Sequence, residues 1–230
     1  MATRAVEELD RATAGTAEHA HTAARIATVL RSRIAAGELT PGSKLSEQAL
    51  SAALGVSRNT LREAFSTLAG ESMVTRIPNR GVFVASPGAD EVREIYRVRR
   101  MIEPAAALWG EITPEVLDTM EAIVRRAQTA RDVGAVADMA DANQALHRAV
   151  VGLTGSESLQ TLMDRVLAEM RLVFHAMASA PDFHSRYVDR NARLVERLKA
   201  GQREEAASGL SADLDVAEAE LLGRLLDETG

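Results

Sequence analysis

The sequence contains no cysteine, which excludes disulfides and thiolate metal sites. Aromatic residues make up only 3% of its 230 residues, so the core must be built from Ala, Leu, Val, Ile and Met, a mixture that favours helices. No apolar run approaches the ~18 residues that a membrane span needs. The first 21 residues include acids and lack the apolar stretch of a signal peptide. We therefore expect a cytoplasmic, mainly α-helical protein with no membrane partner.

The net charge of −6 is distributed unevenly along the chain. Residues 1–85 carry 10 basic and 8 acidic side chains, whereas residues 86–230 carry 17 basic and 25 acidic ones. A locally basic N-terminal part can bind DNA within an acidic protein, because only the contact face meets phosphate. The imbalance is mild, so a nucleic-acid partner has to be argued from the pattern of elements.

That pattern predicts two domains. Residues 1–20 lack an apolar stripe and are expected to form a flexible tail. Residues 21–86 follow the order helix, helix, turn, helix and β-hairpin, which is typical of a winged helix-turn-helix. Residues 86–88 read as a linker. Helical periodicity then predicts an all-α bundle over 89–227, with helices near 89–109, 114–131, 135–153, 157–178, 184–200 and 203–226.

The third predicted helix starts with residues suited to DNA contact. Ser57 can cap it, and Arg58 and Arg62 lie four residues apart on one face. Arginine binds guanine bidentately or clamps a phosphate, and Asn59 and Thr60 add short polar groups. The alternative is an ordinary amphipathic helix with solvated arginines. The preceding helix and the following hairpin, with its turn at Pro78-Asn79-Arg80-Gly81, favour the DNA-binding interpretation.

Three segments, residues 41–47, 54–64 and 81–84, resemble the GntR family of bacterial regulators in order and spacing. The resemblance implies an operator of double-stranded DNA, an inverted repeat that a homodimer reads with two recognition helices and two wings. Gln48 departs from the family, which often has arginine there. The DNA-binding residues expected from motif and resemblance together are Gln48, Ser57, Arg58, Asn59, Thr60, Arg62, Arg80 and Gly81.

The helical part resembles the FadR-like branch of that family, whose sensor is called the FCD domain, over residues 95–106, 143–148, 194–201 and 206–214. Many members hold a divalent metal there with one Asp and three His. The corresponding residues are Asn143, His147, Asn191 and Asp213, and only His147 keeps the family's residue type. Neutral Asn is a poor ligand for zinc-like ions, so we expect no metal cofactor. If a metal binds, His147 and Asp213 would hold it.

The same positions could instead bind an organic effector. Arg99 matches a family position that often enters the cavity, where it can clamp a carboxylate. The expected effector-binding residues are Arg99, Asn143, His147, Asn191 and Asp213. The structural alternative is that His147 is a satisfied core histidine and that Arg99 pairs with Glu103, four residues on. Met163, Met170 and Met177 recur every seven residues and are interpreted as core.

These features predict a transcription regulator, a repressor, whose operator affinity changes with a small carboxylate effector. One alternative is an orphan dimeric regulator without an effector, because two expected ligand positions are Asn. A second is a metal-dependent sensor of the same family. A third is an enzyme, but the sequence has five histidines, no phosphate-binding loop, no HExxH and no nucleophile motif.

Overall fold

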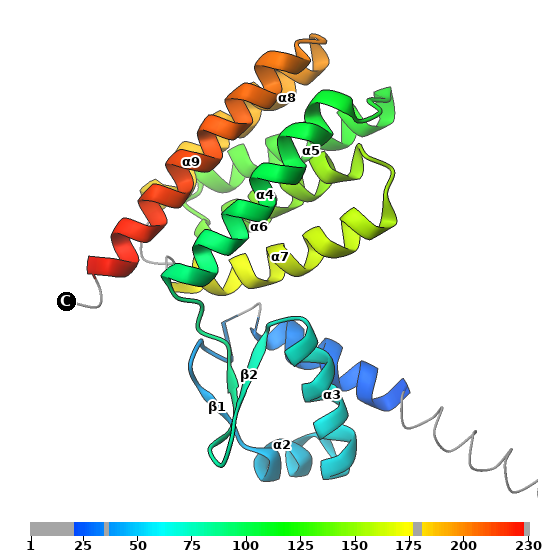
Figure 1. Ribbon diagram of the computed structural model, residues 1–230, viewed down its shortest axis with the longest axis vertical. Helices are drawn as coiled ribbons and strands as arrows, with labels where there is room; N and C mark the ends of the chain where they lie inside the picture. Colours follow the sequence, from blue (N-terminus) through cyan, green and yellow to red (C-terminus); the bar gives the residue numbers. More distant parts are fainter. Residues whose placement is uncertain (1–20, 35–36, 177–180, 228–230) are drawn as a thin grey trace, which may run out of the picture. The chain divides into compact units, whose positions relative to one another are not determined.

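The computed structural model describes residues 21–34, 37–176 and 181–227, and it divides into two compact units with the boundary between Ser86 and Pro87 (Figure 1). The tail predicted over residues 1–20 lies outside the described residues. None of the described helices is long and apolar enough to cross a membrane. Each candidate functional site consists of residues of one unit.

The N-terminal unit is a winged helix-turn-helix, as the sequence predicts. Its buried apolar side chains include Ile26 and Leu30 on the first helix and Leu61 and Phe65 on the recognition helix. In chain order its elements are a helix over residues 21–34, β1 (Lys44–Leu45), α2 (Glu47–Leu54), α3 (Arg58–Gly70), β2 (Val74–Ile77) and β3 (Gly81–Val84).

Serine caps fix where the two helices of the motif begin. Ser46 Oγ accepts a hydrogen bond from Ala49 N at the start of α2, and Ser57 Oγ accepts one from Thr60 N at 3.1 Å at the start of α3. Gly55 ends α2 in the left-handed conformation, with φ of 65°, which costs glycine little. The tight turn between α2 and α3 therefore follows directly from local sequence.

The wing is part of a three-stranded antiparallel sheet with the order β1-β3-β2. The turn over residues 77–80 joins β2 to β3, and Arg80 N donates to Ile77 O across it at 3.0 Å. Asn79, the third residue of this turn, has the positive φ of 61° that a tight turn of this kind requires. The sequence predicts the β2–β3 hairpin but not β1. A two-residue strand has no periodicity to read, and its pairing with β3 is long-range.

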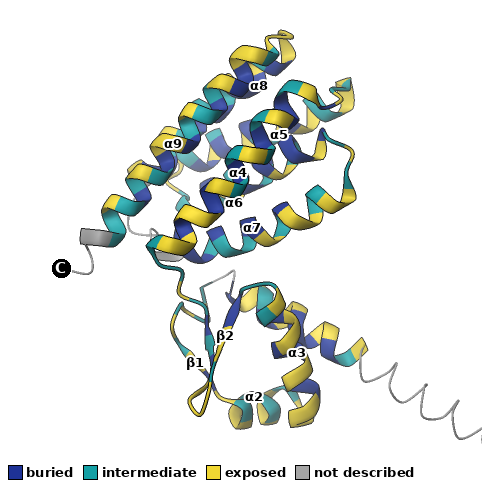
Figure 2. Cartoon of the chain, in the orientation of Figure 1, coloured by how far each residue is buried: buried dark blue, intermediate teal, exposed yellow. Residues whose placement is uncertain are grey.

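The second unit is all helical, as predicted. α4 packs against α6, α7 and α9, while α5 packs against α6 and α8. Each of these helices is buried along one side and exposed along the other (Figure 2). Their bounds are α4 (Ala89–Trp109), α5 (Pro114–Asp132), α6 (Val136–Gly152), α7 (Glu157–Ala176), α8 (Pro181–Lys199) and α9 (Arg203–Asp227).

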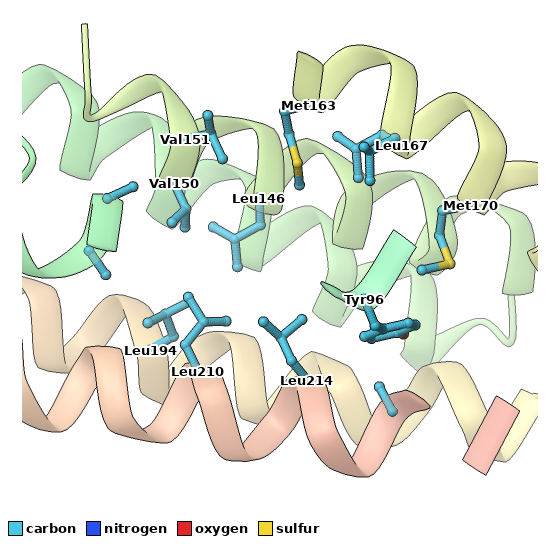
Figure 3. Packing of buried hydrophobic residues seen from close by; sticks show 14 of the residues in the cluster. Tyr96, Leu146, Val150, Val151, Met163, Leu167, Met170, Leu194, Leu210 and Leu214 are labelled. Atoms are coloured by element: carbon cyan, nitrogen blue, oxygen red, sulfur yellow. The ribbon is translucent and has the colours of Figure 1, made fainter. Parts of the chain in front are cut away.

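Aliphatic residues and methionine fill the core of this unit, as the scarcity of aromatics requires. Met163 and Met170 on α7 are fully buried, which confirms their interpretation as core, whereas Met177 lies outside the described residues. Figure 3 shows these methionines with Leu146 and Val150 of α6, opposite Leu210 and Leu214 of α9. The same core places polar side chains of α4, α6, α8 and α9 around one pocket.

Candidate DNA-binding surface and buried pocket

The start of α3 exposes two of the predicted DNA-binding side chains. Arg58 and Asn59 occupy its first turn and are exposed, and Arg58 makes no ion pair within the described part of the chain. The N-terminus of a helix also presents unpaired N–H groups and a partial positive charge. Both residues can therefore approach a phosphate or a base edge without first breaking a salt bridge.

Arg62, one turn further along α3, is held by neighbouring elements. Its Nε lies 3.1 Å from Glu47 Oε2 at the start of α2, and its side chain remains more than half exposed. Its carbonyl oxygen accepts a hydrogen bond from Arg76 of β2 at 2.7 Å. Glu47 thus engages Nε of Arg62 and partly neutralises its charge, while the exposed end of the guanidinium faces solvent.

Thr60 is less accessible than the other predicted contact residues of α3. The residue is 3% exposed, and its hydroxyl lies 2.8 Å from Ser57 Oγ. That hydroxyl and the capping oxygen of Ser57 already interact with each other at the start of the helix. Contact between Thr60 and DNA therefore stays a prediction, and Arg58 and Asn59 are the more accessible groups.

The wing adds a second cationic group. Arg80 at the hairpin tip is exposed, as is the adjacent Gly81, whose φ of 108° suits glycine. The Phe83 ring lies 5.8 Å from the Arg80 guanidinium and 5.9 Å from Lys44 Nζ of β1. Sequence reasoning missed Lys44 because β1 itself was not predicted. Gln48, on α2, is also exposed.

All five predicted effector-binding residues line one pocket of the helical unit. The leucines of α8 and α9 that form much of its apolar wall are labelled with Tyr96 in Figure 3. The cavity volume is about 20 Å³, the room that one water molecule needs, so a larger ligand requires side chains to move. The predicted lining residues are Arg99 of α4, Asn143 and His147 of α6, Asn191 of α8 and Asp213 of α9.

Sequence reasoning missed four further polar residues of this pocket, Tyr96, His184, Tyr187 and Arg190. The spacing of His184, Tyr187, Asn191 and Leu194 places them on one face of α8, and all four line the cavity. That spacing is a signal which the sequence carried. Without the packing, however, it does not distinguish a pocket wall from a core face.

A buried charged triad forms one side of the pocket. Glu103 is 0% exposed and lies between Arg99 Nε, 2.6 Å from its Oε1, and His147 Nδ1, 2.6 Å from its Oε2. The alternative that Arg99 pairs with Glu103 is therefore confirmed, and the same arginine also lines the cavity. Glu103 does not line the cavity itself, but it connects two residues that do, whereas the sequence reasoning treated it only as a partner of Arg99.

The protonation states of this triad follow from its surroundings. Burial alone would raise the pKa of Glu103, but the Arg99 charge and then His147 outweigh it and lower that pKa to about 2. Burial lowers the pKa of His147, partly opposed by Glu103. Since an ionised carboxylate can only accept, Nδ1 of a neutral His147 carries the proton, and its Nε2 remains an acceptor.

One donor of the triad is left over. Arg99 Nη2 is buried and has no hydrogen-bond partner among the described residues. The guanidinium lies 5.0 Å from the centre of the Tyr96 ring, and burial raises the pKa of the Tyr96 phenol to about 12, so that hydroxyl stays protonated. Native proteins rarely leave a buried N–H unpaired, and an anion is the ligand that such a donor recognises best.

Two further pairs of polar side chains meet at the pocket. Asn191 Nδ2 donates to Asn143 Oδ1 at 2.8 Å, and Arg190 Nη1 donates to Asp213 Oδ1 at 2.5 Å. Among the described residues, no three His, Cys, Asp or Glu side chains are close enough together to hold a metal ion. His147 and Asp213, the pair expected to hold a metal if one binds, both line the cavity.

Comparison with known families agrees with this two-part architecture. Residues 22–84 match the bacterial regulatory proteins of the gntR family, and residues 94–215, more than half of the chain, match the FCD domain. The chain belongs to the GntR family. GntR-family proteins are transcription regulators that bind DNA, which overturns the enzyme alternative. The FadR-like, FCD-containing branch fits both matches.

Individual relatives cover different parts of the chain. A GntR transcriptional regulator from Rhodococcus sp. RHA1 is 37% identical, with a TM-score of 0.81, over 87% of this chain and 97% of that one. A transcriptional regulator from an unstable DNA locus of Streptomyces ambofaciens is 30% identical over 57% of this chain and 56% of its own length. The gluconate operon repressor of Bacillus licheniformis is 40% identical over 36% of this chain, and the match spans 34% of that repressor.

Proposed function

We propose that this protein is a dimeric transcriptional repressor whose affinity for its operator changes when a small organic acid binds in the pocket of the helical unit. The observation that carries the effector part is the buried Arg99 guanidinium, with one N–H group unpartnered at a polar cavity. A carboxylate oxygen would supply the missing acceptor. The name of the gluconate operon repressor supports the direction of regulation.

The operator contacts in this proposal are Arg58 and Asn59 for base readout, Arg62 and Gln48 beside them, and Arg80 with Gly81 at the wing. Arg58 is the principal specificity residue because it is exposed, unpaired within the described chain and at the start of α3. A homodimer would place two such helices on an inverted repeat. Sedimentation of the full chain should therefore give twice the monomer mass.

The DNA-binding part is tested with Arg58→Ala, on DNA from upstream of the protein's own gene and on random DNA of equal length. We expect operator binding to weaken by about 1–3 kcal/mol and discrimination between the two DNAs to fall. Arg33→Ala is the matched control, since Arg33 is exposed on the helix over residues 21–34 and is not among the proposed contacts. Equal loss on both DNAs would mean that Arg58 touches only phosphate, and no loss would remove α3 from the interface.

The effector part is tested by screening organic acids for compounds that raise the melting temperature and change operator affinity. A ligand that binds only the folded state stabilises it by mass action, and it alters DNA affinity if it favours one arrangement of the protein. Arg99→Lys keeps the charge beside Glu103 but loses the planar fork. It should weaken the response to the acid at least tenfold and leave DNA binding unchanged.

The orphan regulator is the second candidate, and the cavity of about 20 Å³ is the observation that favours it. If no acid shifts the melting temperature or the operator affinity, while Arg58→Ala still weakens operator binding, the orphan function replaces the effector proposal. The DNA-binding part and the effector part of the proposal can therefore be refuted independently of each other.

A further inference from the structure

The pocket positions that correspond to the metal ligands of related FCD domains do not form a metal site in this chain. Asn143 Oδ1, the oxygen that could face a cation, accepts the hydrogen bond from Asn191 Nδ2 at 2.8 Å. Both amides are neutral, and an amide N–H₂ group is a donor that no cation can use. With no cluster of three His, Cys, Asp or Glu in the described part of the chain, the donor set does not fit a zinc-like ion.

The carboxylate that remains at these positions already has a cation. Arg190 Nη1 lies 2.5 Å from Asp213 Oδ1, and the two side chains are 26% and 31% exposed. The Arg190 guanidinium also lies 5.6 Å from the centre of the Tyr187 ring on the same helix, a cation–π distance. The guanidinium is thus held at the pocket by a carboxylate and by a ring that also lines it.

We propose that Arg190 supplies a second positive charge to this pocket, in addition to that of Arg99, and stands in for a bound divalent cation. The guanidinium neutralises Asp213 and places a permanent positive charge where a cation would have to enter. Like charges in a partly buried pocket repel one another more strongly than in water. The pocket therefore excludes divalent cations and keeps a cationic group that no chelator can remove.

This arrangement changes what the site responds to. A bound metal is lost to chelators and to protonation of its ligands, whereas arginine stays charged throughout the accessible pH range. The melting temperature and DNA binding of the wild-type protein should therefore be the same with EDTA, with added Zn²⁺ and with added Mn²⁺. This inference concerns the charge of the pocket and requires neither an operator nor an organic acid.

Arg190→Gln tests the proposal, with Arg193→Gln as the matched control, because Arg193 is an exposed arginine three residues further along α8. Zn²⁺ and Mn²⁺ are titrated into each full-length protein by calorimetry. We expect the Arg190→Gln variant to bind at least one of them tenfold or more tightly than the wild-type protein and the control. Equal affinities in all three proteins would overturn the proposal, as would near-stoichiometric zinc in wild-type protein purified without chelator.

A second variant keeps the proposal open to refutation if Arg190→Gln does not fold. The Asn143→Asp, Asn191→His double variant restores metal-ligand residue types while Arg190 stays in place. We expect it to bind Zn²⁺ only weakly, because the Arg190 guanidinium still pairs with Asp213. Micromolar zinc binding by the double variant with Arg190 present would show that the guanidinium does not exclude the cation.

Discussion

In the N-terminal unit, the arginines assigned to DNA contact are exposed, whereas in the helical unit Arg99 is 2% exposed and pairs with the fully buried Glu103. Exposed Arg58 and Arg80 are barely desolvated in the folded protein, and they remain available to phosphate. Arg99 and Glu103 lose their hydration on folding, so each depends on the other. The same residue type is thus exposed and able to act at long range in one unit, and fixed in a buried, short-range ion pair in the other.

The difference between buried and exposed ion pairs should have its largest effect on the stability of the helical unit. Glu103→Ala leaves the Arg99 charge buried without its carboxylate and removes the acceptor of His147. We expect a loss of about 3–5 kcal/mol of unfolding free energy, the cost of breaking a buried ion pair by removing one partner. Denaturant unfolding followed by circular dichroism measures it.

Glu94→Ala is the control for that change, because Glu94 makes an exposed ion pair with Arg97 on the same helix, α4. It should cost under about 1 kcal/mol. Similar losses for the two variants would erase the distinction between buried and exposed pairs.

Burial should have a smaller effect on how the unfolding free energy depends on pH. Burial, and then the Arg224 charge, lowers the pKa of His184 to about 4, and its ring packs edge-on against Phe174 and Phe183. Since the unfolded chain binds this proton near pH 6.5, stability should fall as pH decreases from 7 to 5, by about 1–2 kcal/mol from this group.

His184→Phe should reduce the slope of unfolding free energy against pH. The slope that remains should come from His147, whose pKa is also lowered by burial. His21→Phe, at an exposed histidine, is the control and should leave the slope unchanged. An unaltered slope in His184→Phe would mean that His184 is readily protonated in the folded protein.

The smallest effect is expected for an exposed ion pair of the N-terminal unit, Arg62 with Glu47. Glu47→Gln removes the carboxylate beside Arg62 and should change stability by less than about 0.5 kcal/mol. It should tighten DNA binding a few-fold at low salt, because the Arg62 charge is no longer partly neutralised and one negative charge is gone. Fluorescence anisotropy at two salt concentrations measures both the gain and its decrease with salt. Glu38→Gln, at the exposed partner of Arg33, is the control and should bind DNA like the wild-type protein. If Glu47→Gln also binds DNA like the wild-type protein, the prediction is wrong.

Local signals in the sequence were enough for the winged helix-turn-helix. Serine caps at Ser46 and Ser57, glycine at residue 55 and the Pro78-Asn79 turn each act within a few residues, so the bounds of α2 and α3 and the hairpin could be predicted. The burial of Thr60 could not be, because a threonine in a first helical turn points outward or inward according to what packs against it. The two residues of β1 were missed because so short a strand has no periodicity and its pairing with β3 is long-range.

For the helical unit, the sequence by itself determined the helices and, through its resemblance to the FCD domain, named five residues that now lie around one pocket. It could not show that Glu103 joins Arg99 to His147, or that Arg190 neutralises Asp213. Those pairs connect α4 to α6 and α8 to α9, across 44 and 23 residues of chain. Only helix packing sets such distances, because the periodicity of one helix fixes its buried face but not the side chain that meets it from another helix.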